Sequence, residues 1–291
     1  MIMETIVKLN KLNDLYIIDN ADSYLLSNRH FSYRYDESFC INKIRTVKNH
    51  CKKNNKKVYV LLNKIFKDHE LEKLKDFIIK LQKVDIDGIF FTDFAVFMLA
   101  KEINFEHKCI FYHETFLRNS YDILTYKSYG INKIVCSKDM NLEDIKHLPS
   151  KLKDDFGVLC FGYIPLYESQ RKIITHYAKH NKLDKSIINS KELSLKENTR
   201  EEQYKVIEQN GTSSIFDSKV LSYINYANEL SNNVNMFIID SLFFDVNYIK
   251  EVINAFKDSI TNNTNNEETI KKLDETIEFT TGFLNKRIGL M

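Results

Sequence analysis

The stretch KVYVLLN, residues 57–63, is the clearest buried β-strand in this sequence. Its apolar and aromatic residues follow one another without polar alternation, which is typical of strands buried on both faces of a parallel sheet. The next segment, residues 69–82, places apolar residues along one face of a helix. A buried strand followed by an amphipathic helix is the βα unit from which parallel α/β folds are built.

The same order of strand and helix extends along the chain in both directions. Strand-like runs lie at 5–9, 23–26, 57–63, 87–92, 109–112, 133–136, 158–161 and 235–239. Helical patterns lie at 41–53, 69–82, 94–103, 120–129, 142–148 and 247–257. Eight strands, most of them followed by a helix, predict an α/β fold, a (β/α)8 TIM-like barrel, with a doubly wound sheet as the alternative.

The barrel is expected to occupy residues 1–260, since such a domain commonly needs roughly 250 residues. A polar stretch at 169–210 carries no clear strand pattern, so we predict a long insertion after strand seven. Connections of this length are usually functional or disordered. The run TNNTNNEE begins a segment, 261–291, that is expected to be a flexible linker and a short C-terminal tail.

Composition narrows the class of protein. The chain has 43% hydrophobic and 28% charged residues, and 42 basic against 40 acidic side chains give a net charge of +2. No global field favours nucleic acid or membrane, although a local basic patch is compatible with this balance. No apolar run reaches the roughly 20 residues of a membrane span, and no signal-peptide pattern opens the chain, so we expect a cytoplasmic protein.

The five cysteines, at positions 40, 51, 109, 136 and 160, stand alone in the sequence. They form no CxxC pair, so we expect buried free thiols and no metal site.

Several segments, in their order and spacing, resemble peptidase family U32, the collagenase-like protease family that includes tRNA uridine hydroxylation proteins. They are KKVYVLLNKIF (56–66), GIFFTDFAVFMLAKE (88–102), HETFLRNSYDILTYKSYGINKIVCSKDMNLEDI (113–145), LSLKENTREEQYKVIEQNGTSSIF (193–216) and TGFLNK (281–286). The chain departs from the family at GYIPLYESQRK (162–172), where Pro165 and Lys172 stand at two cysteine positions and Gln170 stands at a glycine position. In some family members these cysteines help to hold an iron–sulfur cluster. The resemblance therefore implies a short form without that cluster, and no other cofactor is evident.

Barrel active sites form where the strands end at their carboxyl termini. The polar residues expected there, or in the insertion, are Arg29, Asn63, Lys64, Asp93, Glu114, Asn119, Lys138, Tyr163, Arg171 and Arg200. The five cations among them could converge on a small anionic ligand, or could be solvated surface charges.

The carboxylates and amides among these residues also carry two interpretations. Glu114 and Asp93 are predicted as catalytic acid or base if burial raises their pKa, and otherwise as ion-pair partners of neighbouring cations. Asn63 and Asn119 could bind a ligand or satisfy loop backbone groups. Gly211, in a segment that reads as a turn, is expected to support the fold through a positive φ.

The family resemblance implies a role in tRNA wobble-uridine hydroxylation with a requirement for prephenate, a dicarboxylate that suits a cation-lined barrel mouth. The chain would act alone or with a longer, cysteine-bearing paralogue. Two alternatives remain open: a collagenase-like peptidase that hydrolyses peptide bonds, and a non-catalytic partner of the longer paralogue. The expected partners are thus tRNA and a related protein, with no membrane.

Overall fold

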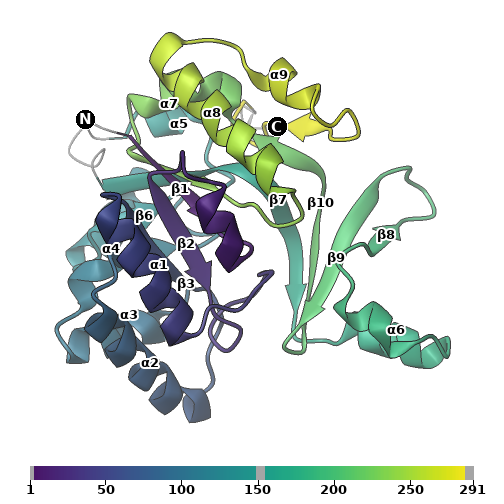
Figure 1. Ribbon diagram of the computed structural model, residues 1–291, viewed down its shortest axis with the longest axis horizontal. Coiled ribbons are helices and arrows are strands. Elements are labelled where there is room, and N and C mark those ends of the chain that lie inside the picture. The colour runs from purple at the N-terminus through teal and green to yellow at the C-terminus, as the bar shows by residue number, and fades with distance from the viewer. Residues whose placement is uncertain (1–2, 149–154, 286–291) are drawn as a thin grey trace.

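The computed structural model describes residues 3–148 and 155–285, which form a closed eight-stranded parallel barrel surrounded by helices (Figure 1). Strand β11 pairs in parallel with β1 on one side and with β7 on the other, which closes the ring. The predicted barrel and its eight strands are therefore confirmed, and the doubly wound alternative is wrong. The barrel strands are β1 (Glu4–Lys8), β2 (Ser23–Ser27), β3 (Lys57–Leu62), β4 (Gly88–Phe91), β5 (Cys109–Tyr112), β6 (Lys133–Val135), the first part of β7 (Phe156–Ser169), and β11 (Met236–Ile239).

The outer helices bury one face each against these strands, as α2 does with Leu74, Ile78 and Leu81. No described helix is long and apolar enough to cross a membrane. The longer helices are α1 (Ile41–Lys53), α2 (Leu71–Val84), α3 (Phe94–Glu102), α4 (Ser120–Ser128), α5 (Leu142–Lys146), α7 (Ala227–Ser231) and α8 (Val246–Asn262). Short 3-10 turns lie at η1 (Leu12–Tyr16), η2 (Asp68–Glu70), η3 (Glu106–Lys108) and η6 (Ile224–Tyr226).

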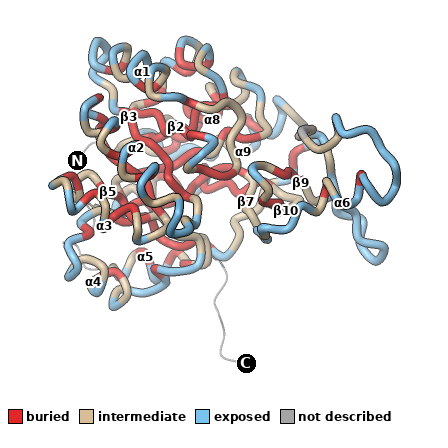
Figure 2. The backbone as a smooth tube through the Cα atoms, turned by 90° about the horizontal axis from the view of Figure 1, so that it is seen from below, coloured by how far each residue is buried: buried red, intermediate tan, exposed pale blue. Residues whose placement is uncertain are grey.

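The insertion after strand seven forms an arm that projects from the barrel (Figure 1). Its elements are the far part of β7, α6 (Ile173–His180), η5 (Lys185–Asn189), β8 (Ser194–Lys196), β9 (Gln203–Gln209) and β10 (Thr212–Ser222). β10 runs antiparallel to β7 and pairs with β9 on its other side. The predicted long insertion after strand seven is therefore present, and it contains strands although 169–210 shows no clear strand pattern. The strand pattern of this segment is weak because α6, β8 and the loops between them are mostly exposed and need few apolar residues (Figure 2).

The arm hairpin turns at Asn210–Gly211, the positions where the sequence predicted a turn. Both residues have positive φ, 53° and 79°, and Thr212 lies opposite Gln209. This is the two-residue geometry that an Asn-Gly pair favours, because both central residues must be left-handed. The fold-supporting interpretation of Gly211 is confirmed.

The C-terminal segment packs back onto the barrel. Residues 261–285, expected as linker and tail, include the end of α8, the helix α9 (Glu267–Lys271) and the strand β12 (Phe279–Thr280). β12 pairs in parallel with β10, and Ile270, Ile277 and Leu284 are buried in the core. The last part of the expected tail, 286–291, lies outside the described residues.

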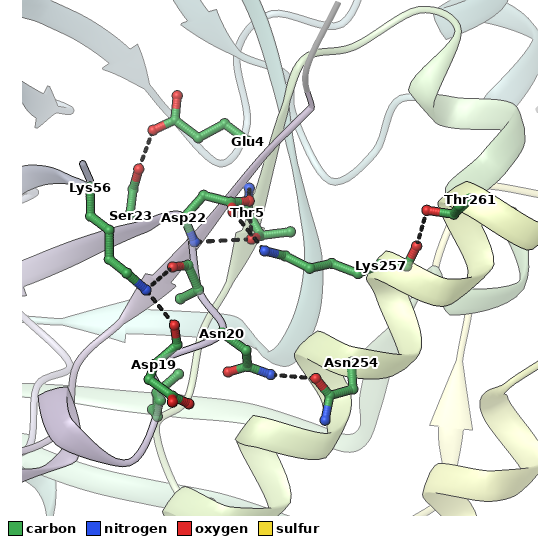
Figure 3. Close-up of polar contacts among 12 residues, drawn as sticks. Glu4, Thr5, Asp19, Asn20, Asp22, Ser23, Lys56, Asn254, Lys257 and Thr261 are labelled. Atoms are coloured by element: carbon green, nitrogen blue, oxygen red, sulfur yellow. Dashed lines mark hydrogen bonds and ion pairs between the residues drawn. The ribbon is translucent and has the colours of Figure 1, made fainter. Parts of the chain in front are cut away.

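Polar contacts join β1, the loop before β2 and helix α8 at the amino-terminal face of the barrel, where the strands begin (Figure 3). The Asp22 carboxylate accepts hydrogen bonds from the Thr5 N–H at 2.9 Å and the Thr5 hydroxyl at 2.5 Å, and Lys257 of α8 reaches its other oxygen at 2.6 Å. Asn20 donates to Asn254 of the same helix at 2.7 Å. This face of a barrel usually serves stability, which leaves the opposite face for function.

β7 leaves the barrel at Gly162, where its backbone has φ +134°. A β-carbon built there would lie 2.8 Å from the carbonyl oxygen of Asp240, closer than any side chain tolerates. The position therefore requires glycine for two reasons, backbone conformation and close approach.

We predict that Gly162→Ala lowers the free energy of unfolding by at least about 2 kcal/mol, because it adds a steric clash to backbone strain. Urea denaturation followed by circular dichroism measures this. The matched control is Gly130→Ala, which also has positive φ (+94°) but whose nearest contact is 3.9 Å away. Equal losses in the two variants would contradict the role of the close approach.

Candidate functional site

A buried ion pair joins the first and last strands of the barrel at its mouth. The ammonium of Lys8, the last residue of β1, donates to both carboxylate oxygens of Asp240 at 2.9 and 2.8 Å. Asp240 directly follows β11. Asn10 adds a hydrogen bond to the Ser241 carbonyl at 2.7 Å, so the two strand ends are tied together.

A second charged group lies in the same region. The Arg34 guanidinium, in the loop after β2, forms salt bridges with Glu114 after β5 and with Glu168 on the extension of β7. The Arg34–Glu168 distance is 3.3 Å, and the Arg34 side chain is only 11% exposed. Arg34 has φ 58°, an uncommon conformation for a non-glycine residue. Strained residues of this kind cluster at functional sites.

The two groups act electrostatically on each other, so we treat Lys8, Arg34, Tyr112, Glu114, Glu168 and Asp240 as one mouth cluster. Burial lowers the pKa of Lys8, while the Asp240 carboxylate opposes that shift and Arg34 adds to it. Burial likewise raises the pKa of Tyr112, and the charge of Glu114 adds to the rise.

Glu168 is the carboxyl of the mouth cluster best placed to hold a proton. Burial raises its pKa, Arg34 opposes the shift, and the neighbouring Glu114 adds to it. For Arg34, burial alone would lower the pKa, but the carboxylates of Glu114 and Glu168 outweigh it and raise the value. The mouth cluster thus combines a fixed guanidinium with a carboxyl that can bind or release a proton, the elements of acid–base chemistry.

Of the predicted catalytic pair, the structure places Glu114 in the mouth cluster and gives Asp93 a structural role. Asp93 caps α3 by accepting from the Ala95 N–H at 2.9 Å and also accepts from the Phe66 N–H at 2.8 Å. Both predicted amide side chains bind backbone groups. Asn63 accepts a hydrogen bond from the Tyr33 N–H at 2.9 Å, and Asn119 caps α4. For these two, the loop-backbone interpretation describes what the side chains contact.

The five predicted cations do not converge on one point. Arg29 and Lys64 line a groove against α2, where Lys64 pairs with Glu70. Lys138 donates to the carbonyl of Pro165 at 2.7 Å. Arg171 and Arg200 lie exposed on the arm, where Arg200 pairs with Glu197 at 3.1 Å.

Tyr163 lies away from these cations, in an aromatic stack. Its ring stacks on Phe244 with centroids 5.4 Å apart, under the ammonium of Lys205 at 5.2 Å.

Five residues of the mouth cluster were missed by the sequence analysis, and one of them is Tyr112, the last residue of β5. Lys8 and Asp240 stand at the carboxyl ends of the first and last strands, so the rule that found Glu114 would have found them as well. Arg34 follows no strand directly, and Glu168 lies on a strand extension that the sequence did not predict. Only the fold brings these last two together.

The ligand set for the family's iron–sulfur cluster does not fit this chain. Pro165 offers no side-chain donor atom and lies opposite Phe216 in β10, and Lys172 precedes α6. Among residues 3–148 and 155–285, no group of three His, Cys, Asp or Glu side chains is arranged to hold a metal ion. We derive no chemistry through such a cluster.

Comparison with known proteins agrees with the resemblance in the sequence. The model of peptidase family U32 matches residues 9–288. The tRNA hydroxylation protein P2 of Bacillus subtilis is 22% identical over 244 residues, which cover 82% of this chain and 79% of that protein. An uncharacterized protease of Methanocaldococcus jannaschii is 26% identical over 104 residues, 35% of this chain and 24% of that one. A solved U32 peptidase structure superimposes with a TM-score of 0.52 at 10% identity, covering 82% of this chain and 92% of the other.

We predict that Arg34→Met lowers the free energy of unfolding by roughly 2–3 kcal/mol, because it leaves two partly buried carboxylates facing each other without a cation. The triple variant Arg34→Met, Glu114→Gln, Glu168→Gln removes all three charges and should recover much of the loss. Urea denaturation of both variants measures this. A triple variant less stable than the single one would contradict the argument.

We also predict that a thiol reagent at pH 8 labels one of the five cysteines in the folded protein and all five after denaturation. Cys40 is exposed, whereas the other four cysteines are buried. Burial raises the pKa of Cys51, Cys109 and Cys136 to about 12 and also raises that of Cys160, so reactive thiolate is scarce. Labelling of Cys160 at the rate of Cys40, measured by mass spectrometry, would contradict the buried positions.

Proposed function

Because this chain belongs to peptidase family U32, we propose that it acts in tRNA wobble-uridine hydroxylation, alone or as a subunit beside a longer paralogue. The observation that carries the proposal is the similarity to the tRNA hydroxylation protein P2, which spans most of both chains. The 244 aligned residues are 79% of that relative, so it has about 244/0.79, or 309, residues. A chain of similar length is thus a tRNA hydroxylation protein in Bacillus subtilis.

The mouth cluster is the centre that we propose for the substrate. It lies at the carboxyl ends of the strands, where barrel enzymes place their chemistry. Arg34 is held in place by two carboxylates, and Glu168 supplies a group that can exchange a proton. Substrate tRNA is found in the cytoplasm, and we place the protein there.

A requirement for prephenate remains part of this proposal, as the family resemblance implies. Lys8 and Arg34 are the cations of the mouth cluster, and both are already paired with carboxylates. A dicarboxylate would therefore bind by displacing Glu114 or Glu168 from Arg34, a step that protonation of Glu168 favours.

The peptidase alternative is tested by incubating the purified protein with gelatin, with and without divalent metal. Asp93 caps a helix and Glu114 pairs with Arg34, so a peptidase would have to free one of these carboxylates to activate water. Cleavage that is lost in Glu114→Gln would favour the peptidase over RNA hydroxylation.

We predict that deleting the gene abolishes 5-hydroxyuridine-type modification at the wobble position in an organism that makes it and has no paralogue of this chain. Mass spectrometry of digested tRNA measures this. The wild-type gene should restore the modification, and Glu114→Gln should restore at least roughly tenfold less, as expected for a group at the reacting centre.

The control for this experiment is Asp85→Asn, which removes one exposed carboxylate at the left-handed C-cap of α2, on the amino-terminal face of the barrel. It should restore the modification as fully as the wild type. Unchanged hydroxyuridine in the deletion strain would reject the proposed function.

A further inference from the structure

The tip of the arm concentrates positive charge. Five cations lie within 15 residues, with Asp184 as the one acidic residue, which gives this segment a net charge of +4. The whole chain has a net charge of +2, so the remainder has a net charge of −2. The cations are Arg171, Lys172, Lys179, Lys182 and Lys185, and we call this surface the α6 basic face.

The cations of the α6 basic face are exposed, and none forms a salt bridge within the described parts of the chain. Other cations of the same arm differ, since Lys191 pairs with Asp36 and Lys196 pairs with Glu201. Unpaired cations on one surface repel one another, and a polyanion relieves that repulsion.

Of these cations Lys179 lies within α6, while the others precede or follow this helix, which is held firmly against the arm hairpin. The Glu208 carboxylate of β9 accepts a hydrogen bond from the Thr175 N–H at 3.0 Å. The buried Ser213 hydroxyl accepts one from the Ile173 N–H at 3.1 Å and donates one to the Arg171 carbonyl at 2.7 Å. These contacts cap the first turn of α6 from outside. Ile174 and Ala178 are buried, so the opposite face of the helix is presented to solvent.

A second basic surface lies beyond the hairpin turn. The groove of about 730 Å³ beside α2 is lined by four cations and two carboxylates, together with Asn210 of the turn. The charged residues are Arg29, Lys64, Lys73, Lys80, Glu70 and Asp76. The Asn210 amide donates to the Arg29 carbonyl, which joins the arm to this groove. Both α2 and α6 lie toward the end of the molecule where the barrel strands terminate, on opposite sides of it (Figure 1).

We propose that the α6 basic face binds the phosphate backbone of folded RNA and holds it beside the mouth of the barrel. This inference rests on the proposed function, since tRNA is then the RNA in question. Lysine and arginine contacts to phosphate position an RNA without reading its sequence. Tyr177, which is 60% exposed among these cations, offers a ring on which an unpaired base can stack.

RNA fits this surface better than an anionic membrane does. Helices that lie on membranes bury an apolar face in the lipid. Here Ile174 and Ala178, two of the apolar residues of α6, are already buried in the protein and cannot enter a lipid layer. Figure 1 shows α6 and α2, the helix that borders the groove, on opposite sides of the molecule, as suits a long polyanion.

The test compares two full-length variants with the same change in charge. One is Lys179→Gln, Lys182→Gln, Lys185→Gln on the α6 basic face. The control is Lys52→Gln, Lys53→Gln, Lys83→Gln, three exposed lysines near the ends of α1 and α2, at the opposite end of the barrel, that form no salt bridge with a described residue. Fluorescence anisotropy measures binding of unmodified tRNA over a range of salt concentrations.

We expect the α6 variant to bind tRNA roughly tenfold more weakly and to lower the slope of log affinity against log salt by about 2, while the control stays near the wild type. Equal loss in both variants, or stronger wild-type binding to phosphatidylserine vesicles than to tRNA, would overturn the inference. Hydroxyuridine is measured separately in the deletion strain. Loss of tRNA binding by the α6 variant, together with unchanged hydroxyuridine after deletion, would reject the proposed function while leaving the RNA surface in place.

Discussion

Closure of the barrel by β11 is the constraint on which the rest of the molecule depends. This strand pairs with β1 on one side and with β7 on the other. Closure brings residues from the two ends of the chain into contact, and the Lys8–Asp240 ion pair is its consequence at the mouth. It also requires Gly162, because β7 passes the carbonyl of Asp240 too closely for a side chain before it leaves the ring. One junction therefore fixes the ring, the buried ion pair and the start of the arm.

The sequence predicted those features that follow from local pattern. Continuous apolar runs such as 57–63 mark strands buried on both sides, and seven of the eight strands have both ends within two residues of the predicted ones. The exception is β7, which continues to Ser169. The rule that functional residues follow strand ends led to Glu114, which does belong to the mouth cluster. It also led to Asp93 and Asn119, whose position before a helix is shared by ordinary N-caps. Residue type and position alone do not separate a cap from a ligand group.

Other features could not be predicted, because they depend on contacts between distant segments. Arg34 reaches Glu168 only because β7 continues past the barrel, and that continuation is stabilised by pairing with β10. The hairpin of β9 and β10 has a small core of its own, in which Ile207 and Phe216 pack with Leu242. Because so few of its residues are buried there, its sequence does not show the apolar pattern of a core strand. The charges of the α6 basic face were visible in the sequence, but their placement on an arm that projects from the barrel was not.

The two residues that stand at the family's cysteine positions have contacts of their own in this structure. The carbonyl of Pro165 accepts a hydrogen bond from Lys138, which links the β6 side of the mouth to the extension of β7. Lys172 belongs to the α6 basic face, next to the Gly211 turn. The two positions where cysteines would bind a cluster thus help to fix the arm and to charge its surface.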